Sequence, residues 1–161
     1  IEKHAKYLGI NIDDKLTWKI HILKIKRQLQ HKTRQLYWII GPKSTLSLNN
    51  KILIYKSIIK PIWTYGLQIW GTACSTNIKI IEQQQCKILR LITRAPRYIS
   101  NNQLLKELKI NTVKETIREQ TTKYFNKITQ HNNNEINKLP EIERNTVRRL
   151  NKKRPIDLVL I

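Results

Sequence analysis

The fold is decided by residues 17–40, which read TWKIHILKIKRQLQHKTRQLYWII. Their apolar side chains recur at steps of three and four, which is the spacing of one face of an α-helix. This stripe consists of Trp18, Ile22, Ile25, Leu29, Leu36 and Ile40, with Thr33 completing the steps. Thr17 is predicted to be the N-cap of this helix, and Gly41-Pro42 is predicted to end it.

A second helix is predicted just C-terminal to the first. Ser47 should cap it, and the helix should run from residue 48 to about residue 60, where Pro61 ends or kinks it. Residues 62–70 read IWTYGLQIW and fit either a kinked continuation or an extended segment, of which we favour the helix. A loop at 71–76 follows.

Three more helices are expected beyond this loop. Asn77 is predicted to cap a helix that runs to Arg94, and a short helix follows at about 102–108. Thr112 and Glu115 have the spacing of a capping box, which predicts a helix from there to about residue 131. From Pro140 on the chain is polar and basic, which is typical of a flexible tail.

The N-terminal side differs from the rest. Residues 5–12 read AKYLGINI, which predicts a β-strand or hairpin, and a turn at Asp13-Asp14-Lys15 follows. The expected fold class is therefore mostly α. A short N-terminal strand or hairpin precedes a helical bundle and a basic, partly disordered C-terminal tail.

The charge of the chain points to a polyanionic partner. Its 161 residues hold 31 Lys and Arg against 11 Asp and Glu, a formal net charge of +20. Such a chain repels itself when compact, which favours nucleic acid as the partner over a ribosome-like assembly or an anionic membrane. The sequence contains no apolar run of 18 residues, so no membrane span is predicted.

Cellular context follows from the cysteines and from the start of the chain. Cys74 and Cys86 are expected to be reduced thiols of an intracellular protein of the nucleus or cytoplasm. The chain has no Met and starts in a predicted strand, which we interpret as an internal fragment of a longer reading frame.

Two helices carry basic faces opposite their apolar stripes. Residues 18–40 hold six Lys and Arg and no acidic residue, so this face lacks the Glu–Lys pairs of an ordinary solvated helix. On the third helix, the cations and Gln83 fall within a band of roughly 80° on a helical wheel. The predicted nucleic-acid-binding residues are Lys24, Arg27, His31 and Arg34 on the first helix and Lys79, Lys87, Arg90 and Arg94 on the third. Trp38 lies on the same side as the first set.

No catalytic or metal-binding constellation is recognisable. Asp13-Asp14 suggests a polymerase metal pair, but no third carboxylate accompanies it, and a turn at the start of a helix explains it better. We expect no catalytic residue, no bound metal and no cofactor in this chain. Trp63, Tyr65 and Trp70 could stack on bases, but their apolar neighbours favour packing in the core or at a helix corner.

The order of motifs resembles the C-terminal region of the reverse transcriptases of jockey-type non-LTR (LINE-like) retrotransposons. The most specific block is KPIWTYG at 60–66, followed by Gln68 and by WGT at 70–72. The other matching segments are KYLGI at 6–10, LTW at 16–18 with His21, LYW at 36–38 with Gly41, KILIYK at 51–56, Gln85, Lys87, LR at 89–90, AP at 95–96, Tyr98, RRL at 148–150 and PIDLV at 155–159. HNN at 131–133 departs from the family's usual His-Pro-Asn.

The resemblance implies a division of the chain into four parts. Residues 1–14 would end the palm, with Tyr7, Leu8 and Gly9 in the hairpin that grips the primer end. Residues 15–99 would form the thumb, 100–139 a C-terminal helical segment and 140–161 a basic flexible tail. The catalytic aspartates of the parent enzyme would lie upstream with its Mg²⁺ ions, so this chain alone should be inactive.

The first functional hypothesis is a template–primer-binding fragment of a reverse transcriptase, which holds an RNA–DNA hybrid by its backbone and joins the palm and fingers of the same polyprotein. The alternative is a stand-alone basic helical module that binds RNA. A third interpretation is a decayed, unexpressed copy of the element.

Overall fold

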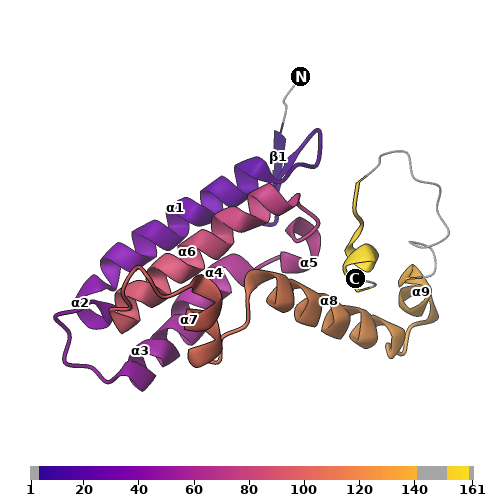
Figure 1. Cartoon of the computed structure of the whole chain (residues 1–161). Helices are drawn as coiled ribbons and strands as arrows, with labels where there is room; N and C mark the ends of the chain where they lie inside the picture. Colours follow the sequence, from indigo (N-terminus) through magenta and orange to yellow (C-terminus); the bar gives the residue numbers. More distant parts are fainter. Residues whose placement is uncertain (1–3, 141–151, 160–161) are drawn as a thin grey trace.

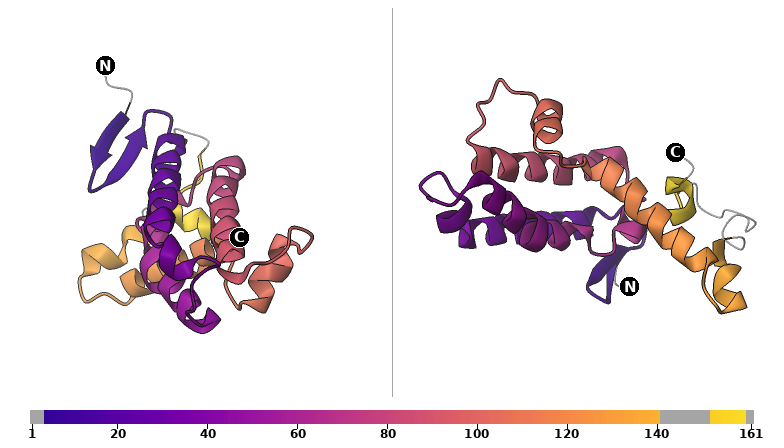
Figure 2. Two further views of the ribbon diagram at one scale, coloured as in Figure 1. Left: turned by 90° about the vertical axis from the view of Figure 1, so that its left-hand side faces the viewer. Right: turned by 90° about the horizontal axis from the view of Figure 1, so that it is seen from below.

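The computed structural model describes residues 4–140 and 152–159. At its N-terminal end, β1 (His4–Tyr7) and β2 (Ile10–Asp13) form an antiparallel hairpin, with Tyr7 opposite Ile10 and His4 opposite Asp13. The hairpin stands at one end of a helical bundle and projects from it (Figures 1 and 2). The expected mostly α fold with an N-terminal hairpin is confirmed.

The first helix divides in two. α1 (Lys19–Gln35) is followed by α2 (Tyr37–Ile40), and Leu36 joins them. The predicted N-cap, Thr17, is wrong, because Trp18 occupies that position in a left-handed conformation (φ 61°). No side chain caps α1, and the Asp13 carboxylate instead accepts hydrogen bonds from the backbone N–H groups of Thr17 and Trp18, the two residues just before the helix.

The second helix continues through Pro61. Ser47 caps α3 (Leu48–Ile54) as predicted, and a π-helical turn, η1 (Tyr55–Ile59), leads into α4 (Lys60–Thr64). Because proline lacks an N–H group and crowds the preceding turn, a widened turn just before it is a physically reasonable accommodation. After a break at Tyr65–Gly66, α5 (Leu67–Trp70) completes the kinked helix that we favoured for 62–70.

α6 (Ser75–Thr93) begins three residues earlier than predicted. Its N-cap is Cys74 rather than Asn77, and Arg94 ends it in a left-handed conformation. The Asn77 side chain is buried and donates to the Thr17 carbonyl at 2.9 Å. Asn77 therefore ties the start of α6 to the segment before α1, a contact that no local pattern could predict.

The helices after α6 start against the bundle and then lead away from it (Figure 1). α7 (Asn101–Glu107) is short, and α8 (Val113–Thr129) starts with the predicted capping box of Thr112 and Glu115. α9 (Asn134–Asn137) and the 3-10 turn η2 (Pro155–Leu158) follow. Of the expected tail, 141–151 and 160–161 lie outside the described residues, whereas η2 packs against α8 with Ile156 and Leu158 buried.

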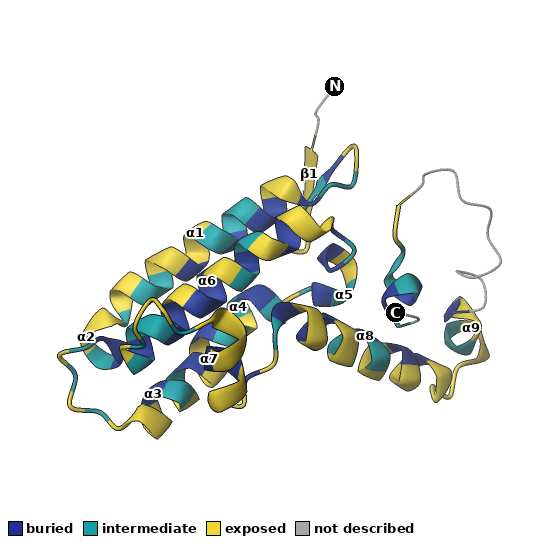
Figure 3. Ribbon diagram, viewed as in Figure 1, coloured by how far each residue is buried: buried dark blue, intermediate teal, exposed yellow. Residues whose placement is uncertain are grey.

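The core lies where α1, α4 and α6 meet. α1 and α6 run side by side, and α3 to α5 return beneath them (Figure 1). Buried and exposed positions alternate along these helices, as expected of amphipathic helices in a bundle (Figure 3). Trp63 and Trp70 are buried in it, as expected, whereas Tyr65 is 57% exposed. Cys74 and Cys86 form no disulfide. Within the described part of the chain, no helix is long and apolar enough to cross a membrane.

Candidate nucleic-acid interface

The tip of the hairpin is a tight turn held against the bundle. Its two central residues, Leu8 and Gly9, both have positive φ angles (44° and 82°), as in a type I′ turn. Glycine adopts this backbone freely, but a leucine is strained there. The Tyr65 hydroxyl donates to the Leu8 carbonyl at 2.7 Å, and the Lys24 ammonium donates to the Gly9 carbonyl at 3.1 Å. The strained turn is therefore fixed to α1 and to the residue after α4.

A close approach behind the turn brings the hairpin onto the bundle. Gly66 has a φ of +62°, and a Cβ atom there would lie 2.7 Å from Cδ1 of Ile10. Ile10 is itself buried in the core. A glycine at 66 thus allows β2 to pack directly over the break between α4 and α5.

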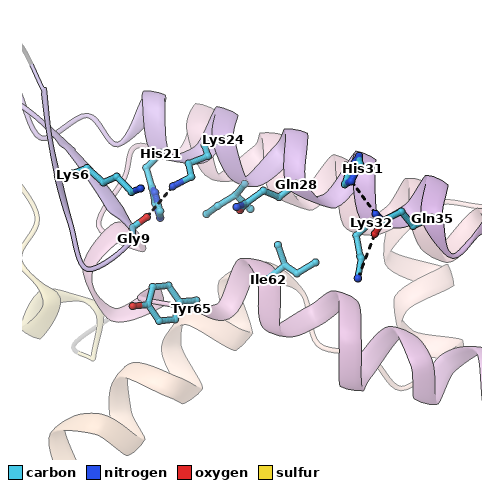
Figure 4. A pocket seen from close by; sticks show the side chains of 11 residues that line it. Lys6, Gly9, His21, Lys24, Gln28, His31, Lys32, Gln35, Ile62 and Tyr65 are labelled. Carbon is cyan, nitrogen blue, oxygen red and sulfur yellow. Dashed lines mark hydrogen bonds between the residues drawn. The ribbon is translucent and has the colours of Figure 1, made fainter.

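A groove of about 540 Å³ lies between the hairpin, α1 and α4. We call it the hairpin groove. It is lined by Lys6, Gly9, His21, Lys24, Ile25, Gln28, His31, Lys32, Gln35, Ile62 and Tyr65. Lys6, His21 and Lys24 gather at its hairpin end, and His31, Lys32 and Gln35 gather at its other end (Figure 4). α1 therefore supplies one whole wall, from His21 to Gln35, over about four turns.

The electrostatics of the hairpin groove are entirely cationic. Lys6, Lys24 and Lys32 line it, and no carboxylate does. From Lys15 to Ile81 the chain contains no acidic residue, and no described Lys or Arg in that range forms an ion pair. His21 adds no charge at neutral pH, because burial and then the neighbouring Lys24 lower its pKa below 6.5. The ammonium groups of the three lysines in the hairpin groove are thus not neutralised by any acidic residue of the described chain.

The residues predicted on the first helix divide between two adjacent faces. Lys24 and His31 line the hairpin groove, whereas Arg27 and Arg34 are exposed on the neighbouring outer face. His31 is also exposed and belongs to both faces. The basic side of α1 therefore comprises a groove wall and an adjoining outer stripe.

The residues predicted on the third helix have different environments. Lys79, Lys87 and Arg94 are exposed on α6. Its place on the basic face of the helix predicts that Arg90 is exposed too, and this prediction is wrong. Its guanidinium is half-buried and donates to the carbonyls of Pro96 and Ile99 at 2.8 and 2.6 Å, and to Asn101 Oδ1 at 2.9 Å. Arg90 therefore anchors the loop between α6 and α7.

Several residues of the hairpin groove were missed from the sequence. Gln28, Lys32 and Gln35 share the side of α1 that carries Lys24, and their helical spacing could have identified them. Lys6 and Tyr65 could not be found this way, because the hairpin and the break after α4 bring them there.

Residues 4–140 and 152–159 contain no cluster of three His, Cys, Asp or Glu side chains that could hold a metal ion. Asp14 is exposed, and Asp13 is buried at the start of α1. Burial alone would raise the pKa of Asp13, but hydrogen bonds from the side chain and backbone of Thr17 and the backbone of Trp18 outweigh it and lower the pKa below 3.8. The expected role of Asp13 at the start of the helix is confirmed.

Comparison with known proteins gives a consistent family. The chain is 39% identical over 96% of its length to a probable RNA-directed DNA polymerase from transposon X-element of Drosophila melanogaster. It is 37% identical over 83% of its length to the RNA-directed DNA polymerase from mobile element jockey of the same species. A probable RNA-directed DNA polymerase from transposon BS is also 37% identical, over 79% of the chain.

These matches cover only a part of each relative. The chain spans 17%, 15% and 14% of the lengths of the X-element, jockey and BS proteins. No family model and no solved structure matches the chain. Over most of its length, the chain is therefore homologous to a part of the RNA-directed DNA polymerases of jockey-type non-LTR retrotransposons.

Proposed function

We propose that this chain is the template–primer-binding, C-terminal part of an RNA-directed DNA polymerase. In this proposal the hairpin ends the palm and grips the primer end through Tyr7, Leu8 and Gly9, and α1 to α6 form the thumb. The palm and fingers of the same polyprotein would be its neighbours. The names of the relatives support a polymerase, and the basic groove at the hairpin supports the binding role.

The observation that carries the proposal is the acid-free hairpin groove. Its lysines come from the hairpin and from α1, so a phosphate backbone that follows α1 would meet Lys32, Lys24 and then Lys6. Ammonium groups contact phosphates without reading the bases, which suits an enzyme that must copy any sequence. Arg27, Arg34, Lys79, Lys87 and Arg94 would add further backbone contacts from exposed faces.

The described chain would contribute binding rather than chemistry. Polymerases hold two metal ions with paired carboxylates, and no such cluster is present in the described ranges. We therefore propose that the Mg²⁺ ions of the parent enzyme are held by residues of its other parts. Primer extension by the purified chain with Mg²⁺ and deoxynucleotides should yield no product above a protein-free control.

The binding proposal is tested by a salt titration. Fluorescence anisotropy should be measured with a labelled RNA–DNA hybrid and with a second hybrid of permuted sequence. If about 5–8 phosphates are contacted, the slope of log affinity against log salt should be about −4 to −7, and equal for both sequences. A slope near zero, or a strong preference for one sequence, contradicts the proposal.

A further inference from the structure

Trp38 differs from every other tryptophan of the chain. It is 75% exposed, whereas Trp18, Trp63 and Trp70, which complete the four, are at most 5% exposed. It lies on α2, at the end of the bundle away from the hairpin (Figure 1). Tyr37 beside it is also half-exposed. Tyr37 and Trp38 thus expose two aromatic rings next to each other on one short helix, which leaves an aromatic surface open to a partner.

The surroundings of Trp38 identify the kind of partner. Arg27, His31, Arg34 and Trp38 follow one another at helical spacing, and all four are exposed. At 1.5 Å per residue, this stripe extends about 16 Å along α1 and α2. It adjoins the hairpin groove through His31, and no acidic residue occurs between Lys15 and Ile81. A partner must therefore carry negative charge along the stripe and a flat apolar group at its end.

A single nucleic-acid strand combines those two properties. Its phosphates match the arginines, and its unpaired bases have free faces, whereas the bases of a duplex already stack on each other. We infer that Trp38 stacks on an unpaired base of the strand that the bundle holds, and that Arg34 and Arg27 contact the phosphates of that strand. This inference rests on the proposed function.

The uneven exposure of the tryptophans supplies a direct assay. Quenching of the intrinsic fluorescence by iodide should report mainly on Trp38, because the other three are buried. A 12-nucleotide single-stranded RNA should quench this exposed emission and protect it from iodide. A blunt RNA–DNA hybrid of 12 base pairs should do so much less.

Three variants complete the test. Trp38→Ala should weaken binding of the single strand about fivefold or more and binding of the blunt hybrid less than twofold, and Trp38→Phe should restore most of the loss. Tyr98→Ala is the matched control, because Tyr98 is an 87% exposed aromatic residue between α6 and α7. It should leave both affinities unchanged.

The inference is overturned if Trp38→Ala binds the single strand like the wild type while the hybrid is still bound. It is also overturned if sedimentation finds a dimer of the wild-type chain that Trp38→Ala dissociates, because a second copy of the chain would then cover Trp38. If the wild-type chain binds neither probe, the proposed function itself is rejected. The failure of the inference and the failure of the proposed function are therefore distinguishable.

Discussion

Replacing Asp13 with Asn should destabilise the whole bundle, because this buried carboxylate joins β2 to the start of α1. Oδ2 accepts from the backbone N–H and the hydroxyl of Thr17, both at 2.7 Å, and Oδ1 accepts from the Trp18 N–H at 2.8 Å. An amide has one oxygen, so one backbone N–H would face an NH₂ group. Loss of one charge-assisted hydrogen bond costs about 1.5–3 kcal/mol. In a domain of this size that lowers Tm by about 3–12 °C.

The effect should depend on pH in one direction. The pKa of Asp13 is lowered by folding, so its stabilisation is fully present above its ordinary pKa of 3.8 and is lost as the pH falls through the folded-state pKa. Thermal melts of the wild type and Asp13→Asn should therefore differ at pH 7 and converge below about pH 4. Asp14→Asn removes the same charge from an exposed side chain and is the control. Equal melting temperatures of all three proteins at pH 7 would refute this role of Asp13 at the start of α1.

Three further predictions concern stability and are checked by urea denaturation. Arg90→Gln should cost about 1–3 kcal/mol, because it removes hydrogen bonds to the α6–α7 loop, whereas exposed Lys87→Gln should stay within about 0.5 kcal/mol. Lys51→Met should cost about 2 kcal/mol, because the buried ammonium donates to the carbonyls of Gly41 and Ser44, and Lys43→Met should cost little. Gly66→Ala should cost at least about 1 kcal/mol, since its positive φ and the contact with Ile10 both oppose a Cβ. Equal stability within either matched pair, or a neutral Gly66→Ala, would contradict these contacts.

The features of the fold that could be predicted from the sequence are those that depend on residues close together in the chain. The apolar stripe of α1, the Ser47 cap and the Thr112–Glu115 capping box each depend on neighbours within four residues. The errors occurred where tertiary contacts override local preference. Asn77 looks like a cap but donates to the Thr17 carbonyl, and the N–H and hydroxyl of Thr17 donate to Asp13 while Trp18 takes the N-cap position.

The candidate site could be predicted only in part. Helical periodicity placed Lys24 and His31 on a basic side of α1, and both line the hairpin groove. The same reasoning failed for Arg90, because a wheel shows which way a side chain points but not which loop folds back over it. The hairpin brings Lys6 into the groove, and the break between α4 and α5 brings Tyr65 there. Helical periodicity cannot reveal either position.

The most direct test of the hairpin groove as the binding site compares two variants with equal loss of charge. Lys24→Gln/Lys32→Gln removes two groove lysines, and Lys106→Gln/Lys127→Gln removes two exposed lysines of α7 and α8. In salt titrations with an RNA–DNA hybrid, the groove variant should lower the magnitude of the log–log slope by about 2 and weaken binding to all sequences alike. The control variant should keep a slope close to that of the wild type. Equal losses of slope and affinity in the two variants would show that binding follows net charge alone, and would contradict an organised interface at the hairpin groove.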